Sequence, residues 1–109
     1  MKLSELLEQT GWEQLTDGTD DDREINGCYL GDLLSWVMGR AQRGNVWITI
    51  MSNVNIVAVA SLTDCACVVL AEGVTPEQSV VDKANSQGVA LVRSPVPAYE
   101  SAMALHSLL

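Results

Sequence analysis

Short, continuously apolar runs alternate with segments of helical periodicity along this chain, and this alternation constrains the fold most strongly. Residues 46–50 and 66–70 are rich in β-branched and apolar side chains, which is typical of strands covered on both faces. A similar run covers residues 89–92, and a further strand is expected over residues 25–30. Runs of this kind predict a parallel sheet between two layers of helices.

Helical patterns fill the stretches between these runs. Leucine spacing predicts a first helix over residues 2–10, and a second helix is expected over residues 32–43. Thr75 is expected to cap a helix that begins at Pro76 and ends at Gly88. A closing amphipathic helix is expected to turn inward the side chains of Tyr99, Ala102, Met103, Leu105 and Leu109.

The segment over residues 52–65 is ambiguous. Its apolar residues alternate as in a strand, whereas its length suits a helix. Parallel strands need a crossover of about a dozen residues, which is usually helical. We therefore expect a buried helix between the runs 46–50 and 66–70.

These elements together predict a single α/β domain over residues 1–109, with three layers, a mainly parallel sheet and helices on both faces. Ligands of such folds bind outside the carboxyl ends of the strands. Helix capping is the competing role for the polar residues at these places, and Asp32 in particular is expected to be a cap. The ligand-binding candidates are Gly31, Asp32, Ser52, Asn53, Asn55 and Arg93.

Charge limits the partners. The chain has 14 acidic and 6 basic residues, a net charge of -8, so it lacks the cationic surface that nucleic acids and anionic membranes require. Five of the acids lie in residues 17–24, where a solvated loop is expected, with Arg23 paired to a neighbouring carboxylate. The acid spacing does not fit a calcium loop, so no metal site is predicted. A protein partner with a basic surface is expected.

The cysteines and the hydropathy indicate the compartment. Cys28, Cys65 and Cys67 contain no CxxC pair, which favours reduced thiols in the cytoplasm. Cys65 and Cys67 are expected to pack on one face of a strand as small apolar residues. No signal peptide is recognisable, and no apolar run reaches the ~18 residues of a membrane span. We expect a soluble cytoplasmic protein.

The catalytic signals are weak. The only histidine, His106, has no partner that the sequence can place, and no cofactor motif is present. Trp47 is expected in the core, whereas Trp36 lies beside an apolar helix face and is the candidate for a dimer interface. A small enzyme that uses Asp32 and Asp64 as acid and base remains an alternative, as does an assembly partner without a ligand.

Four segments resemble the DRTGG domain family. They are Asp22-Arg23 with Gly27, and the residues 31–38, 47–55 and 58–62. The motif that names the family is degenerate here, because Glu24 stands in place of Thr and Gly27 in place of two glycines. The resemblance implies a fold similar to the N-terminal domain of HPr kinase/phosphorylase, no catalytic role, and self-association as a dimer.

The expected function follows from these observations and from the resemblance. We expect a non-catalytic regulatory or protein-interaction module. It would act as a homodimer and sense a small nucleotide-like or anionic ligand.

Overall fold

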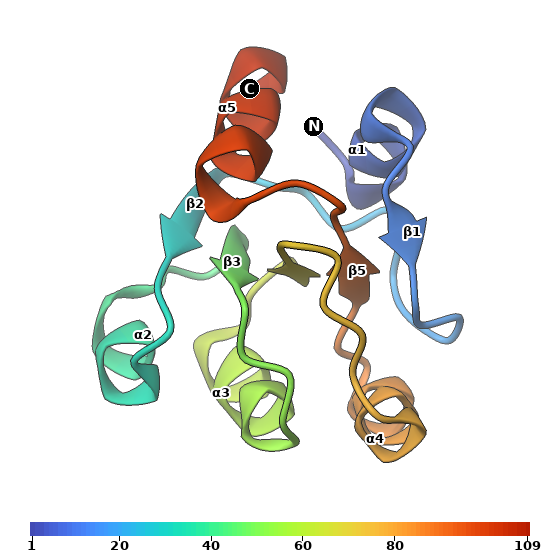
Figure 1. The fold of residues 1–109 in the computed structure, drawn as a ribbon, viewed down its shortest axis with the longest axis vertical. Coiled ribbons are helices and arrows are strands. Elements are labelled where there is room, and N and C mark those ends of the chain that lie inside the picture. Colours follow the sequence, from blue (N-terminus) through green and yellow to red (C-terminus); the bar gives the residue numbers. More distant parts are fainter.

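The computed structural model describes all residues 1–109, and it confirms the expected α/β fold. The chain alternates five helices with five strands (Figure 1). The helices are α1 (Leu3–Thr10), α2 (Leu34–Arg40), α3 (Asn55–Thr63), α4 (Gln78–Gln87) and α5 (Ala98–Leu108). The strands are β1 (Glu13–Gln14), β2 (Gly27–Leu30), β3 (Asn45–Thr49), β4 (Cys67–Leu70) and β5 (Leu91–Arg93). No helix is long and apolar enough to cross a membrane.

The sheet has the strand order β1-β5-β4-β3-β2. Strands β2 to β5 are parallel, and β1, which the sequence pattern did not predict, pairs antiparallel with β5. Each parallel strand lies beside the next one in the chain, and right-handed crossovers therefore place α2, α3 and α4 on one face. Helices α1 and α5 cover the other face, which gives the three expected layers (Figure 1).

Alternate side chains of the central strands fill two apolar clusters, one on each face of the sheet. In β3, Val46 and Ile48 belong to the cluster under α1 and α5, whereas Trp47 belongs to the cluster under α2, α3 and α4. Trp47 is completely buried, as expected, and its indole Nε1 donates a hydrogen bond of 2.8 Å to the carbonyl of Gly31. The indole therefore fills the core without leaving its polar atom unpaired.

The ambiguous segment is a helix, as predicted. Helix α3 buries Ile56, Val57, Val59 and Ala60, whereas Leu62 is exposed. The helix ends at Asp64, which adopts a left-handed backbone conformation with a φ of 56°. The apparent strand alternation therefore does not mark the inner face, which combines Ile56 and Ala60 with Val57 and Val59 at helical spacing.

The capping roles predicted for Thr75 and Asp32 were wrong, whereas α4 is followed by Gly88 as expected. Helix α4 begins at Gln78 rather than Pro76, and the hydroxyl of Thr75 accepts a hydrogen bond of 2.6 Å from Arg93 Nη1. Helix α2 begins at Leu34, and the carboxylate of Asp32 accepts hydrogen bonds from the end of β3. In both places a neighbouring strand supplies a competing partner, which local sequence does not reveal.

The inner face expected for α5 was also wrong in part. The helix buries Ser101 and Leu105, while Tyr99, Met103 and Leu109 are 69%, 52% and 52% exposed. The hydroxyls of Ser101 and Ser94 lie 2.7 Å apart and satisfy each other. This pairing lets a polar residue occupy the inner face and turns the large apolar side chains outward.

The cysteines do not share a face. Cys67 lies in β4 and belongs to the cluster under α1 and α5, whereas Cys65 precedes the strand and packs against the other cluster. All three thiols are free. Burial raises the pKa of Cys67 far above its ordinary value and raises the pKa of Cys28 to about 11. The expected packing as a small apolar side chain therefore holds for the buried Cys67, whereas the shared face with Cys65 was wrong.

Candidate functional site

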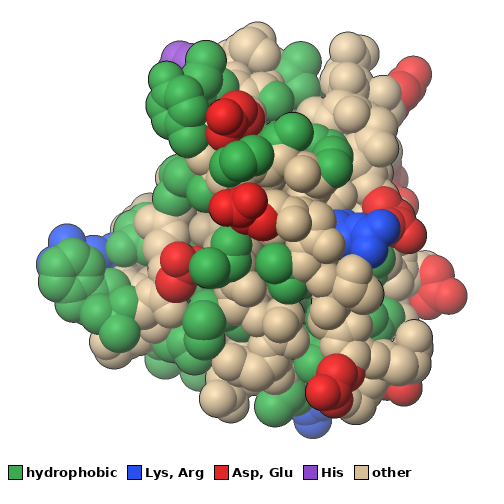
Figure 2. All heavy atoms as spheres, viewed as in Figure 1, with side chains coloured by type: hydrophobic (Ala, Val, Ile, Leu, Met, Phe, Trp, Pro, Cys, Tyr) green, Lys and Arg blue, Asp and Glu red, His purple; other side chains and the backbone are tan.

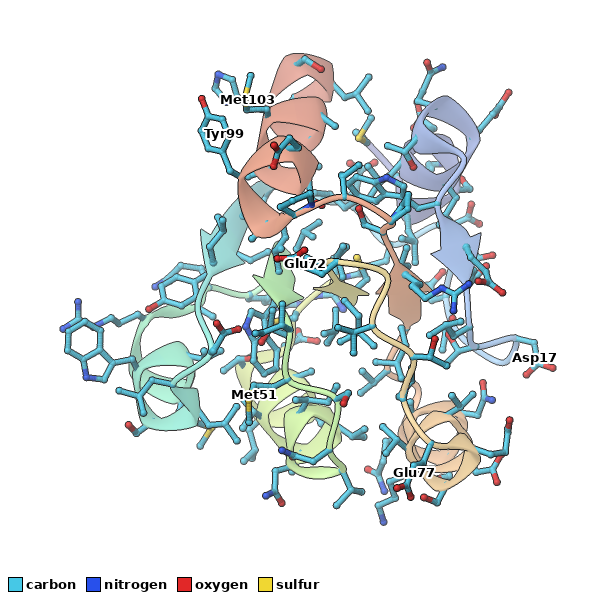
Figure 3. The ribbon with its side chains drawn as sticks, in the orientation of Figure 1. Asp17, Met51, Glu72, Glu77, Tyr99 and Met103 are labelled. Atoms are coloured by element: carbon cyan, nitrogen blue, oxygen red, sulfur yellow. The ribbon has the colours of Figure 1, made fainter.

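The carboxyl ends of β3 and β4 lead into the first turns of α3 and α4. A cavity of about 440 Å³ lies between these two turns. Figure 3 shows Glu77 at the start of α4, and Glu77 is one of the residues that line this cavity. The lining residues are Ser52, Asn53, Val54, Thr75, Glu77, Ser79 and Val80.

Two of the six predicted ligand-binding residues, Ser52 and Asn53, line this cavity. The others are elsewhere. Asn55 lies in a neighbouring hollow between α3 and α4, and Arg93 lies in a third hollow beside Gly11 and Glu13. Gly31 and Asp32 line none of the hollows. The predicted set is therefore spread along the edge of the sheet instead of forming one site.

Asn53 also has the structural role that competed with ligand binding. Its side-chain Oδ1 accepts a hydrogen bond of 2.9 Å from the backbone N–H of Asn55, and its carbonyl accepts one of 3.3 Å from Ile56. These bonds order the entry of α3. The amide group still lines the cavity, where its Nδ2 is available to a ligand.

Thr75, Glu77 and Ser79 line the cavity from the α4 side, and the sequence pattern did not single out Glu77 or Ser79. Thr75 is held by Arg93, whose Nη2 also lies 2.8 Å from Glu13 Oε1. The guanidinium of Arg93, which does not itself line this cavity, is therefore already paired with Thr75 and Glu13. The sequence signal for this part of the site was the turn at Thr75-Pro76 after β4, which is followed by the polar residues Glu77 and Ser79.

Asp32 connects two strand ends. Its Oδ1 accepts hydrogen bonds of 2.7 Å from Thr49 Oγ1 and 3.0 Å from the N–H of Ile50. Asp64 is the second carboxylate of the enzyme hypothesis, and it lies before the start of β4. It is therefore at the amino-terminal ends of the parallel strands, whereas Asp32 is at their carboxyl-terminal ends. The structure does not bring these carboxylates together, and His106 lies on α5 among exposed residues. No predicted acid–base pair is assembled.

The residues of the family motif lie at the amino-terminal edge of the parallel strands, away from the cavity. Arg23 donates from Nη1 to Asp64 Oδ1 at 3.0 Å and from Nη2 to the Asp64 carbonyl at 2.8 Å. Arg23 is therefore paired with a carboxylate, as expected, and this partner is 41 positions away in the sequence instead of in the acidic loop. Asp22 lies 3.9 Å from Lys2 Nζ. At Gly27 a Cβ atom would lie 3.2 Å from the Asn45 amide.

Carboxylates dominate the charge around the carboxyl-terminal edge. Asp32 follows β2, Glu72 follows β4, and Glu77 directly precedes α4. Glu72 is drawn near the centre of Figure 3. Glu72 has a φ of 63°, an uncommon backbone conformation for a residue other than glycine. No group of three or more His, Cys, Asp or Glu side chains is placed to hold a metal ion.

Comparison with known proteins agrees with this architecture. The model of the DRTGG domain family matches residues 5–108. A similar solved structure is that of the CBS and DRTGG domains of the regulatory region of Clostridium perfringens pyrophosphatase, complexed with its activator diadenosine tetraphosphate. The TM-score is 0.77 at 11% sequence identity, and the match covers 95% of this chain.

The match spans 45% of that solved chain, just under half its length. A comparison with curated protein sequences found no significant match. The family expected from the four sequence segments is confirmed, because its model covers nearly the whole chain. This chain belongs to the DRTGG domain family.

Proposed function

We propose that this DRTGG domain is a non-catalytic regulatory module that binds a small nucleotide-like or anionic ligand in the cavity between α3 and α4. The observation that carries the proposal is the cavity itself, which lies where two helices begin beyond the carboxyl ends of neighbouring parallel strands. Open α/β sheets bind their ligands at this edge. The regulatory character follows from family membership and from the regulatory region that contains the related domain.

The chemistry of the cavity suits a ligand with hydrogen-bond acceptors and a negative group. Helices α3 and α4 have nine and ten residues, and the first-turn N–H groups of each favour an anion by ~0.3–1 kcal/mol. Ser52, Asn53 and Ser79 add donors. Glu77 opposes a highly charged ligand, so affinity for free phosphate alone is expected to be weak.

Thermal unfolding in the presence of candidate ligands tests this proposal. The probes are AMP, ATP, diadenosine tetraphosphate and inorganic phosphate, since a ligand that binds only the folded chain raises its stability by about 2.7 kcal/mol at 100 times its dissociation constant. The expected result is an upward shift with at least one nucleotide. Unchanged unfolding with all four probes would contradict ligand sensing and favour an assembly partner without a ligand.

A pair of variants locates the site. Ser79→Glu places a carboxylate in the wall of the cavity, whereas Gln78→Glu adds the same charge one residue earlier, outside the lining. Both acids lie in the first turn of α4, where the helix dipole favours them. Because Gln78→Glu removes the bond of 2.9 Å that Gln78 donates to Asp82, the Tm of both variants without ligand is measured as a control. Ser79→Glu should weaken nucleotide binding at least tenfold and Gln78→Glu much less. Equal effects would place the ligand elsewhere.

We also propose that the module acts as a homodimer, with Trp36 at the interface. Trp36 is 54% exposed, and the guanidinium of Arg40 lies 3.9 Å from the centroid of its ring. A half-exposed indole of this kind is a frequent interface anchor. A different protein partner, one with a basic surface, would bind the acidic loop over residues 17–24 and not the surface around Trp36. The free thiols support a reducing compartment such as the cytoplasm.

A further inference from the structure

Five large apolar side chains are exposed around strand β2, and we call them the β2-edge surface. They come from the end of β2, the start and first turn of α2, and the outer side of α5. Figure 2 shows apolar atoms over α2 and over α5 on this side, and Figure 3 shows Tyr99 and Met103 on the side of α5 that faces away from α1. The members and their exposed fractions are Leu30 (45%), Leu33 (59%), Trp36 (54%), Tyr99 (69%) and Met103 (52%).

Strand β2 is an unprotected sheet edge. It is the last strand in the order and pairs only with β3, so its outward N–H and C=O groups have no strand partner. Its four residues, Gly27–Leu30, include no charged residue and no proline. The opposite edge, β1, has only two residues and carries the charged side chain of Glu13. Proteins usually blunt an edge as at β1, so an open edge such as β2 favours pairing with another chain.

Charge selects a second copy of this chain as the partner. Each copy has a net charge of -8, so two copies repel each other over most of their surfaces. The β2-edge surface comes from residues 27–43 and 98–109. These segments contain two acids and two bases, so their net charge is zero. Eight of the fourteen acids lie in residues 1–24, toward the β1 edge. Two copies therefore meet with least repulsion at β2.

We infer that two copies join β2 to β2 in antiparallel register about a two-fold axis, so that two five-stranded sheets become one continuous sheet. Such an axis brings α2 against the partner's α2 and α5 against the partner's α5. The five apolar side chains are 45–69% exposed on each copy, and the paired strands add to the area that a dimer buries, against the ~800 Å² per partner of a standard interface. This inference rests on the homodimer proposed above and specifies its geometry.

Sedimentation equilibrium tests the surface with charged variants. Leu30→Lys puts like charges on the paired edge strands, and Trp36→Glu does so between the facing α2 helices. Leu62→Lys is the matched control, because Leu62 is 73% exposed on α3, outside the β2-edge surface. We expect the first two variants to raise the dimer dissociation constant at least tenfold and the control to leave it within twofold. Circular dichroism verifies that each variant folds.

Hydrogen exchange tests the strand pairing without a variant. The amides of β2 should exchange more slowly as the protein concentration rises, whereas those of β1 should not change. A dimer that survives Leu30→Lys and leaves β2 exchange independent of concentration would overturn the edge pairing while keeping the homodimer. A monomer at all concentrations up to about 1 mM would overturn both, since an interface of standard size binds more tightly than this.

Discussion

The two bonds from Arg23 to Asp64 lead to the sharpest stability prediction. They tie the loop before β2 to the turn between α3 and β4, across 41 positions of sequence. One bond goes to the carboxylate and the other to the Asp64 carbonyl, which also accepts a hydrogen bond of 3.0 Å from the N–H of Gly44. Removing the guanidinium with Arg23→Ala should therefore loosen the amino-terminal edge of the sheet.

The magnitude follows from exposure. The side chains of Arg23 and Asp64 are 28% and 50% exposed, so the ion pair itself contributes no more than ~1 kcal/mol. The bond from a charged donor to the carbonyl adds about another 1 kcal/mol after discounting for solvent. We expect Arg23→Ala to lower the free energy of unfolding by about 1–2 kcal/mol, and a loss of 1 kcal/mol lowers the Tm of a domain of this size by about 4–8 °C.

The structure offers a matched control. Arg43 makes one contact of 3.0 Å with the same carboxylate but is 85% exposed, so Arg43→Ala should change stability by less than about 0.5 kcal/mol. Urea unfolding at fixed pH and salt measures both variants. Equal losses for Arg23→Ala and Arg43→Ala would refute the reasoning, because only the bond to the carbonyl and the lower exposure distinguish the two arginines.

Two further predictions concern buried groups. Ser94 and Ser101, both fully buried, share a bond of 2.7 Å, so each single substitution by Ala should cost about 1–2 kcal/mol and the double substitution clearly less than the sum. Additive losses in urea unfolding would contradict this coupling. Burial raises the pKa of the Cys28 thiol from 9.0 to about 11, so the folded state keeps a proton that the unfolded chain releases. Stability should therefore fall from pH 9 to 11, less steeply in Cys28→Ala, and parallel pH profiles would disprove the assignment.

The candidate ligand cavity, the family-motif residues and the proposed dimer surface occupy separate places in this domain. The candidate ligand cavity lies at the carboxyl-terminal edge between α3 and α4, and the family-motif residues lie at the amino-terminal edge. The β2-edge surface lies at one side of the sheet. Helix α2 contacts α3, which gives a direct physical connection between the proposed dimer contact and one wall of the cavity. If both proposals hold, a ligand that orders the start of α3 biases the dimer, and linkage requires the reverse effect to be equal.

The local sequence pattern was enough to predict the layers of this fold. The apolar runs identified β3, β4 and β5, because strands covered on both faces are apolar throughout, and connection length identified α3 as a crossover helix. Ser52 and Asn53 were also identified at the candidate cavity, since their place after β3 follows from the topology rule alone. The sequence by itself therefore determined the fold class and the edge of the sheet at which the cavity lies.

Only the tertiary structure decided which long-range partner each polar group takes. Thr75 and Asp32 had capping patterns, yet Arg93 and Thr49 supplied other bonds, and Arg23 reached past its own loop to Asp64. The outward turn of Tyr99 and Met103 likewise depends on the buried serine pair beneath α5. The physical reason is that burial periodicity is local, whereas hydrogen-bond partners and surface neighbours are set by the approach of segments distant in sequence.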